Sequence, residues 1–280
     1  GGDWQILERT AQNLYRTGRR AEGLKAYADA ASAATRANRA QDAFRLLYTA
    51  AAILEREGDR DKAISNYRDL ALRMRGETAA AATHRRAILL GYNRARQEKQ
   101  GLEKVEVWID EHLDIWPSAP TANELRILKA QLRFARRDWI TAAKVCHSVT
   151  PNAPQLQQAL AIAGKSWQRH LDQLQQRRQP TEQVANQAAK LFEDVIYAGV
   201  GRLPERWSEI ARDAALEAAR LRLNYAPRAA RQVEDLLRAA LSGTPTPTPE
   251  WGGNAQTLLV VAVASQPGRQ DDGSFLLEQA

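Results

Sequence analysis

The stretch Glu55–Tyr67, which reads EREGDRDKAISNY, decides the fold, because it joins two helical patterns through one glycine. After Gly58 a small residue, Ala63, and then an aromatic residue, Tyr67, follow on the second helix. The earlier stretch 15–27, which reads YRTGRRAEGLKAY, places Gly23 and Tyr27 at the same distances from its own glycine. A single helix-turn-helix unit cannot bury its apolar face, so such units stack on one another. The sequence therefore predicts an all-α chain of repeated helix pairs.

Turns of the same kind recur at intervals of 38 to 46 residues. We expect them near Gly18, Gly58, Gln100, Asp138, Gln179, Tyr225 and Gly268. The first helix of each pair is then expected near 3–17, 39–57, 79–98, 120–137, 154–178 and 204–223. The second helices are expected near 20–35, 60–74, 101–116, 139–149, 181–198 and 227–241. Prolines between the units agree with these limits, and Pro204 is expected to open a first helix, where its missing N–H costs little.

The chain divides into three parts on this pattern. Residues 1–243 form the repeat array, and 244–250 form a Thr/Pro linker, an extended spacer that no helix can cross. Residues 251–280 form a partial seventh helix pair or the start of a further segment. Within them, 257–263 has strand propensity, but we expect a helix because the run ends near the expected turn at Gly268.

The first two units carry a family resemblance. Trp4-x2-Leu7 is followed by Gly18, Gly23 and Tyr27, and Phe44-x2-Leu47 is followed by Gly58, Ala63 and Tyr67. These residues resemble the tetratricopeptide repeat family, although the units here are about 41 residues long, against about 34 in that family. HEAT-like stacking is the alternative geometry.

The resemblance implies a right-handed α-solenoid of about six antiparallel helix pairs plus a partial seventh. In such repeats the first helices line a concave groove, and the function is protein binding without catalysis. Tyr27 and Tyr67 are then expected to pack against the first helix of their own unit.

Composition narrows the function only weakly. The 40 basic residues include eight lysines, and the net charge of +7 is compatible with an acidic partner. The Arg- and Ala-rich usage is typical of a GC-rich bacterial genome. The longest uncharged apolar run, 257–265, is too short to span a bilayer. Localisation stays open between the cytoplasm and export after removal of a leader, and we expect the chain to be part of a longer protein.

Residue patterns for chemistry are absent from the sequence, so we expect no enzyme activity, no cofactor and no metal. His84, His112, His147 and His170 lack the spacing of metal ligands. Cys146 lies in an apolar pattern and is expected to be a buried thiol. The polar run Asp110, Glu111, His112 and Asp114 is expected at the surface.

The clearest functional signal is a run of positive charge, because 125–137 contains five basic residues and no acidic one. At 100° per residue, Leu125, Leu128, Leu132 and Ala135 form one apolar stripe. Beside this stripe, within an arc of about 100°, lie the five basic residues Arg126, Lys129, Arg133, Arg136 and Arg137. The same alignment adds Arg86, Asn93 and Arg96 from the previous unit. From the next unit, with Leu160, Gly164 and Trp167 as packing residues, it adds Gln158, Lys165, Gln168 and Arg169.

We call the charged residues and Asn93 of this set the basic strip. Since first helices line the groove in the family, the strip is expected to bind an acidic protein segment or peptide, uncovered by carboxylates of the same chain. One alternative is that these charges are solvated, or pair with acidic second helices such as the one carrying Glu103 and Glu106. Another is a helical repeat that binds nucleic acid through the same strip, and we consider nucleic acid an unlikely partner because residues that would specify bases are not evident.

Overall fold

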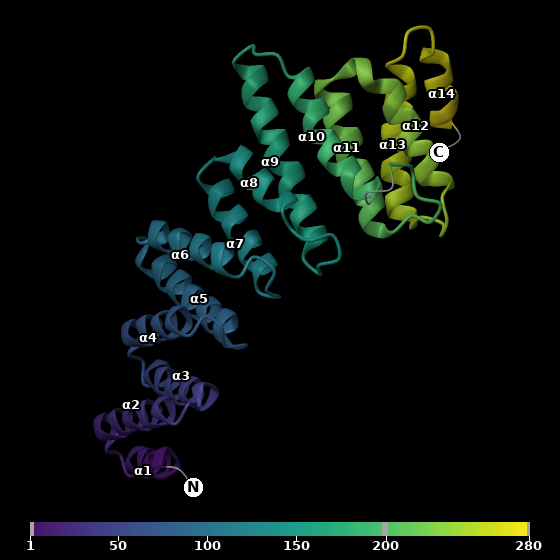
Figure 1. Cartoon of the computed structure of the whole chain (residues 1–280). Coiled ribbons are helices and arrows are strands. Elements are labelled where there is room, and N and C mark those ends of the chain that lie inside the picture. The colour runs from purple at the N-terminus through teal and green to yellow at the C-terminus, as the bar shows by residue number, and fades with distance from the viewer. Residues whose placement is uncertain (1–2, 198–200, 279–280) are drawn as a thin grey trace. The chain divides into compact units, whose positions relative to one another are not determined.

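The structure, a computed structural model, describes residues 3–197 and 201–278. Over these residues the chain is all-helical and has no β-strand, as expected, and Figure 1 shows the order of the helices. The helices of the first half are α1 (Asp3–Arg16), α2 (Arg20–Arg36), α3 (Ala40–Arg56), α4 (Arg60–Arg73), α5 (Ala80–Glu98), α6 (Leu102–Ile115) and α7 (Ala122–Ala135). Those of the second half are α8 (Trp139–His147), α9 (Leu156–Gln176), α10 (Glu182–Tyr197), α11 (Glu209–Tyr225), α12 (Ala230–Ser242), α13 (Pro249–Ala264) and α14 (Gln270–Glu278), with a 3-10 turn at Pro227–Ala229.

The chain forms two compact units, Gly1–Leu125 and Arg126–Ala280, and the boundary falls within α7. In the first unit α1 packs on α2, and the series continues helix by helix as far as α6. In the second unit α8 packs on α9 and the series continues helix by helix to α14. There α11 also contacts both α9 and α13 directly. Packing of successive helices is therefore common to both units, as expected of a helical repeat.

The seven expected turn positions all lie between consecutive helices or at a helix end. Gly18, Gly58 and Gly268 have φ of +81°, +85° and +75°, a left-handed conformation in which a Cβ is unfavourable. At two other turns an arginine adopts this conformation, Arg137 with φ +62° and Arg178 with φ +56°. The spacing in the sequence thus located the turns, including those that have no glycine to mark them.

The expected start of the sixth first helix is wrong. Pro204 does not open a helix, because α11 begins only at Glu209, where the Ser208 side chain accepts a hydrogen bond from the N–H of Ala211. The residues before it run beside the Thr/Pro linker, and the N–H of Trp207 donates to the carbonyl of Thr244 at 2.7 Å. The linker is therefore fastened to the chain segment before α11. Beyond the linker, 257–263 is helical within α13, as predicted.

Alanine, branched aliphatic and aromatic side chains fill the cores. Tyr27 and Tyr67 are 5% and 0% exposed, which confirms that they are packing residues. Tyr67 contacts the first helix of its own expected unit, since its ring lies 5.2 Å from that of Tyr48 and its hydroxyl donates to Glu55 at 3.0 Å. In the second unit Phe192 is fully buried, and its ring lies 5.1 Å from that of His147.

Two histidines are buried against each other in the first unit, and the expectation that His112 lies at the surface is wrong. The Nδ1 atoms of His84 and His112 are 3.3 Å apart, and both side chains are fully buried. Burial lowers the pKa of each imidazole to about 4, so both are neutral near pH 7. His84 also contacts Glu111, and His112 contacts Thr121. The pair is a packed, hydrogen-bonded element of the core.

The remaining expectations on single groups are simpler. Cys146 is buried, as expected, and burial raises the pKa of its thiol to about 12. Over the described ranges, no cluster of three or more His, Cys, Asp or Glu side chains is placed to hold a metal ion. None of the described helices combines the length and the apolar character that crossing a membrane requires.

Candidate functional site

The five basic residues of 125–137 do not all lie on the helix face that the sequence predicts. Leu125, Leu128 and Leu132 are buried as predicted, but Ala135 is exposed. The helix ends at Ala135, and the following arginine pair, Arg136 and Arg137, lies in the loop before α8. The left-handed conformation of Arg137 turns the chain there. The prediction that all five basic residues share one helical arc is therefore wrong for these two, because the helix is shorter than the periodic pattern.

The other cations of this run are engaged. Arg126 is half-buried, and burial lowers the pKa of its guanidinium group. Arg133 lies 3.4 Å from the carboxylate of Asp138. Each of Arg126, Lys129, Arg133 and Arg136 has an interaction partner. The prediction that carboxylates of the same chain leave the strip uncovered is wrong at Arg133, since Asp138 follows only five residues later.

The same prediction is also wrong at Arg86. Its guanidinium group forms two hydrogen bonds of 2.8 Å to the carboxylate of Glu55, one to each oxygen. The group also lies 5.7 Å from the ring centre of Tyr67. Two parallel bonds to one carboxylate fix both the position and the direction of an arginine. Arg86 is therefore held by α3 and does not offer its charge to a ligand.

Asn93 and Arg96 remain exposed, and a hollow of about 520 Å³ lies beside them between α3 and α5. We call it the α5 hollow. It is lined by Glu55, Arg60, Leu90, Asn93, Arg94, Arg96 and Gln97. Three guanidinium groups thus face one carboxylate, and that carboxylate already accepts from Arg86 and Tyr67.

The three arginines of the α5 hollow differ in how firmly they are held. Arg94 pairs with two carboxylates, Asp61 and Glu98, so its guanidinium group is already engaged. Arg60 donates to the neutral amide of Gln97 at 3.2 Å, and Arg96 lies over the ring of Tyr92 at 5.7 Å from its centre. No carboxylate forms an ion pair with Arg60 or Arg96 in the described part of the chain. These two are the cations that a ligand can reach.

In the second unit the packing of α9 follows the sequence alignment. Leu160, Gly164 and Trp167 are buried, and Lys165 and Arg169 are exposed one turn apart. The sequence therefore placed the buried and exposed faces of this helix correctly. The neighbouring polar residues Gln158 and Gln168 are exposed as well.

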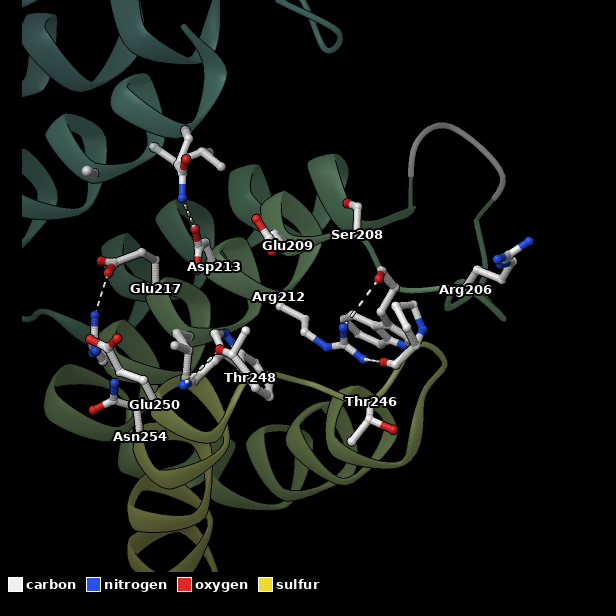
Figure 2. A pocket seen from close by; sticks show the side chains of 18 residues that line it. Arg206, Ser208, Glu209, Arg212, Asp213, Glu217, Thr246, Thr248, Glu250 and Asn254 are labelled. Carbon is white, nitrogen blue, oxygen red and sulfur yellow. Dashed lines mark hydrogen bonds and ion pairs between the residues drawn. The ribbon is translucent and has the colours of Figure 1, made fainter. Parts of the chain in front are cut away.

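A larger hollow in the second unit was not expected from the sequence. It has a volume of about 890 Å³ and lies over α9, α11 and α13, and we call it the α11 hollow. Figure 2 shows its lining side chains. Gln157, Leu160 and Ala161 come from α9; Glu209, Arg212, Asp213, Leu216, Glu217 and Arg220 from α11; Glu250, Trp251 and Asn254 from α13. Arg206, Trp207, Ser208, Pro245, Thr246 and Thr248 come from the two loop segments.

Arg212 holds one side of this hollow together. It is 3% exposed, and its guanidinium group donates to four backbone carbonyls, two before α13 and two beside α11 and α12. It also lies 5.7 Å from the ring centre of Trp251. A guanidinium group has five N–H donors in a fixed plane, which suits several acceptors at once. Arg212 therefore fastens the Thr/Pro linker, and its donors are directed into the protein.

The carboxylates of the α11 hollow are held in different ways. Glu217 accepts from Arg220 at 2.6 Å, and burial raises the pKa of its carboxyl group. Asp213 accepts from the amide of Gln157 at 2.9 Å. Over the described residues, no hydrogen bond or ion pair engages the side chains of Glu209 and Glu250. Both are exposed in the first turn of a helix, where the helix dipole favours a negative charge.

Comparison with known proteins does not assign the chain to a family. No model of a protein family matches the sequence, and no curated protein is similar to it. The site is therefore defined by the two hollows and their charges. The sequence located Asn93 and Arg96 but not Arg60 or the α11 hollow, because that hollow is lined by three helices and two loop segments that are distant in sequence.

Proposed function

We propose that the chain is a non-catalytic, tetratricopeptide-like scaffold that binds an acidic segment of another protein in the α5 hollow. The architecture in this proposal is a right-handed solenoid of six antiparallel helix pairs and a partial seventh. Support comes from the regular turn positions and from the packing of each helix on the next. In the family that the sequence resembles, first helices line the ligand groove, and α3 and α5 are first helices in this alignment.

The class of ligand is inferred from which charged side chains of the α5 hollow already have a partner. Arg60 and Arg96 are exposed without a carboxylate partner, whereas Glu55, the carboxylate in the lining, is occupied by Arg86 and Tyr67. Guanidinium groups bind carboxylates through paired hydrogen bonds, and a concave wall strengthens their field. Asn93 adds a neutral donor and acceptor beside them. An extended acidic peptide satisfies all three groups.

The test is titration with a fluorescent oligoglutamate peptide. We expect binding that weakens as salt rises, because charges at the surface are screened over about 8 Å at physiological ionic strength. Arg96→Glu should lower the affinity at least about tenfold, since one charged hydrogen bond contributes about 1.5–3 kcal/mol. Loss of binding should come without loss of helicity, because Arg96 is exposed.

Arg73→Glu is the matched control. Arg73 is exposed in the last turn of α4, as Arg96 is in the last turn of α5, so both reversals place a negative charge at a helix C-terminus. Only Arg96 lines the hollow. Equal loss in the two variants, or no loss in either, would contradict the proposal. Tighter binding of a single-stranded oligonucleotide than of the peptide would favour the nucleic-acid alternative instead.

A further inference from the structure

The α11 hollow differs from the α5 hollow in that its base is apolar. Leu160, Leu216 and Trp251 line it, yet they are only 3%, 5% and 8% exposed. The base is thus almost closed to water, and an apolar group placed on it gains mainly van der Waals contact with these side chains. The volume of about 890 Å³ is in the range of pockets that bury a large part of a ligand.

Two of the three arginines that line this hollow are engaged by the chain itself. Arg212 donates its N–H groups to backbone carbonyls, and Arg220 is paired with Glu217. Figure 2 shows Arg206 on the opposite side of the hollow from Asp213, Glu217 and Glu250. Arg206 is exposed there, so the accessible charge is negative on the side of Asp213 and Glu250 and positive at Arg206.

Three of the four carboxylates in the lining have no cationic partner among the described residues and remain accessible to a ligand. Glu209 and Glu250 are exposed and hold no cation of the described chain, and Asp213 is bound only by the neutral Gln157 amide. These carboxylates come from two helices, α11 and α13. Within the described residues, no group of them is arranged to hold a metal ion. A ligand with a flexible cationic group next to an apolar group matches this arrangement better than a bare metal ion.

We propose that the α11 hollow is a second peptide-binding site, which takes a basic segment carrying an apolar side chain next to a lysine or arginine. The apolar side chain lies on Leu160, Leu216 and Trp251, and the cation lies among Glu209, Asp213 and Glu250. This site is chemically the reverse of the α5 hollow and does not depend on it. The scaffold thereby binds two segments of opposite charge.

A direct readout is available at Trp251. Its indole N–H is buried and has no hydrogen-bond partner among the described residues, and its ring lies under Arg212 in the hollow wall. We expect the ¹⁵N–¹H signal of this indole, assigned with Trp251→Phe, to shift when a peptide repeating Gly-Leu-Arg is added. The charge-reversed peptide, repeating Gly-Leu-Glu, should leave the signal in place.

Two variants test the two parts of the site separately. The double variant Glu209→Gln with Glu250→Gln removes charge at exposed positions and should weaken binding of the Gly-Leu-Arg peptide about tenfold or more, with a smaller salt dependence. Ala161→Trp places a large ring at an exposed position of the lining and should block binding without a change of charge. Neither change removes a buried contact.

Asp271→Asn is the control, because Asp271 is exposed in the first turn of α14 and does not line the hollow. It should bind the peptide as the unaltered protein does. No binding, equal binding by the double variant, or an equal loss in Asp271→Asn would overturn the proposal. Oligoglutamate binding, measured on the same variants, should not change, so failure here is distinguishable from failure of the α5 hollow.

Discussion

The α5 hollow of the first unit and the α11 hollow of the second hold their arginines in different ways. In the first, Arg60 and Arg96 stay exposed while the carboxylate of Glu55 is occupied. In the second, Arg212 is buried under carbonyl groups while Glu250 stays exposed. The charge that a ligand meets is thus set by which side chains already have partners. A count of charges along the helices does not reveal it.

If the two units differ only at their surfaces, their cores should be equally well packed. Tyr67→Ala in the first unit and Phe192→Ala in the second should therefore each lower the free energy of unfolding by about 3–5 kcal/mol, because both rings are fully buried. Denaturation followed by circular dichroism measures this loss.

Truncation of exposed valines provides the control for each unit. Val107→Ala and Val261→Ala should change stability by less than about 0.5 kcal/mol, since these side chains are 63% and 46% exposed. If Tyr67→Ala left the thermal midpoint unchanged, the alignment of the second repeat would be wrong, and with it the assignment of α3 and α5 as first helices.

The next largest effect is expected at Arg212, the buried arginine of the α11 hollow. Arg212→Leu should cost about 3 kcal/mol, because it leaves backbone carbonyls without their donor in a buried place. It should also expose residues 243–248, between α12 and α13, to proteases. Arg231→Leu, at a residue whose side chain is 67% exposed, should cost less than about 1 kcal/mol. Similar losses in both variants would mean that Arg212 does not hold the hollow.

Acid should destabilise both units through their buried histidines. Burial lowers the pKa of His84 and His112 in the first unit, and of His147 in the second, to about 4, against 6.5 for the free group. Between these values the unfolded chain binds more protons than the folded chain, so stability falls as pH falls. The loss from pH 6.5 to 5.5 is up to about 1.4 kcal/mol for each histidine.

Denaturant titrations at a series of pH values measure that slope. NMR titration of the imidazoles then assigns it, since His84, His112 and His147 should remain neutral down to about pH 5. An imidazole of the His84–His112 pair that titrates near 6.5 would show that this core is open to water.

The smallest effect is expected from substitution of Glu55, the carboxylate that lines the α5 hollow. Glu55→Gln releases Arg86 and removes the carboxylate of the α5 hollow, at a cost of about 1 kcal/mol for a partly exposed ion pair. Affinity for oligoglutamate should then rise severalfold. A fall in affinity would mean that the peptide needs the Glu55–Arg86 arrangement rather than free positive charge.

Much of the fold could be predicted from the sequence, because helix turns leave local marks. Gly18, Gly58 and Gly268 stand where the chain must turn, and the regular spacing extended the pattern to Arg137 and Arg178. The start of α11 could not be placed from Pro204. The segment before that helix is fixed by a contact with Thr244, which lies far along the chain.

The candidate site was less predictable, since its state depends on pairs distant in sequence. Arg86 is held by Glu55, which is 31 residues away, and Arg212 by carbonyls as far away as Pro245. Periodicity gives the side of a helix on which an arginine lies. It does not give the partner that occupies the arginine.

The claim that the two hollows prefer opposite charges is tested most directly by one crossed titration. The oligoglutamate and Gly-Leu-Arg peptides are titrated separately into the unaltered protein, into Arg96→Glu and into the double variant Glu209→Gln with Glu250→Gln. We predict that Arg96→Glu loses only the acidic peptide and that the double variant loses only the basic one. If either change weakened both peptides equally, or if both peptides bound one hollow, the account of two separate sites would be contradicted.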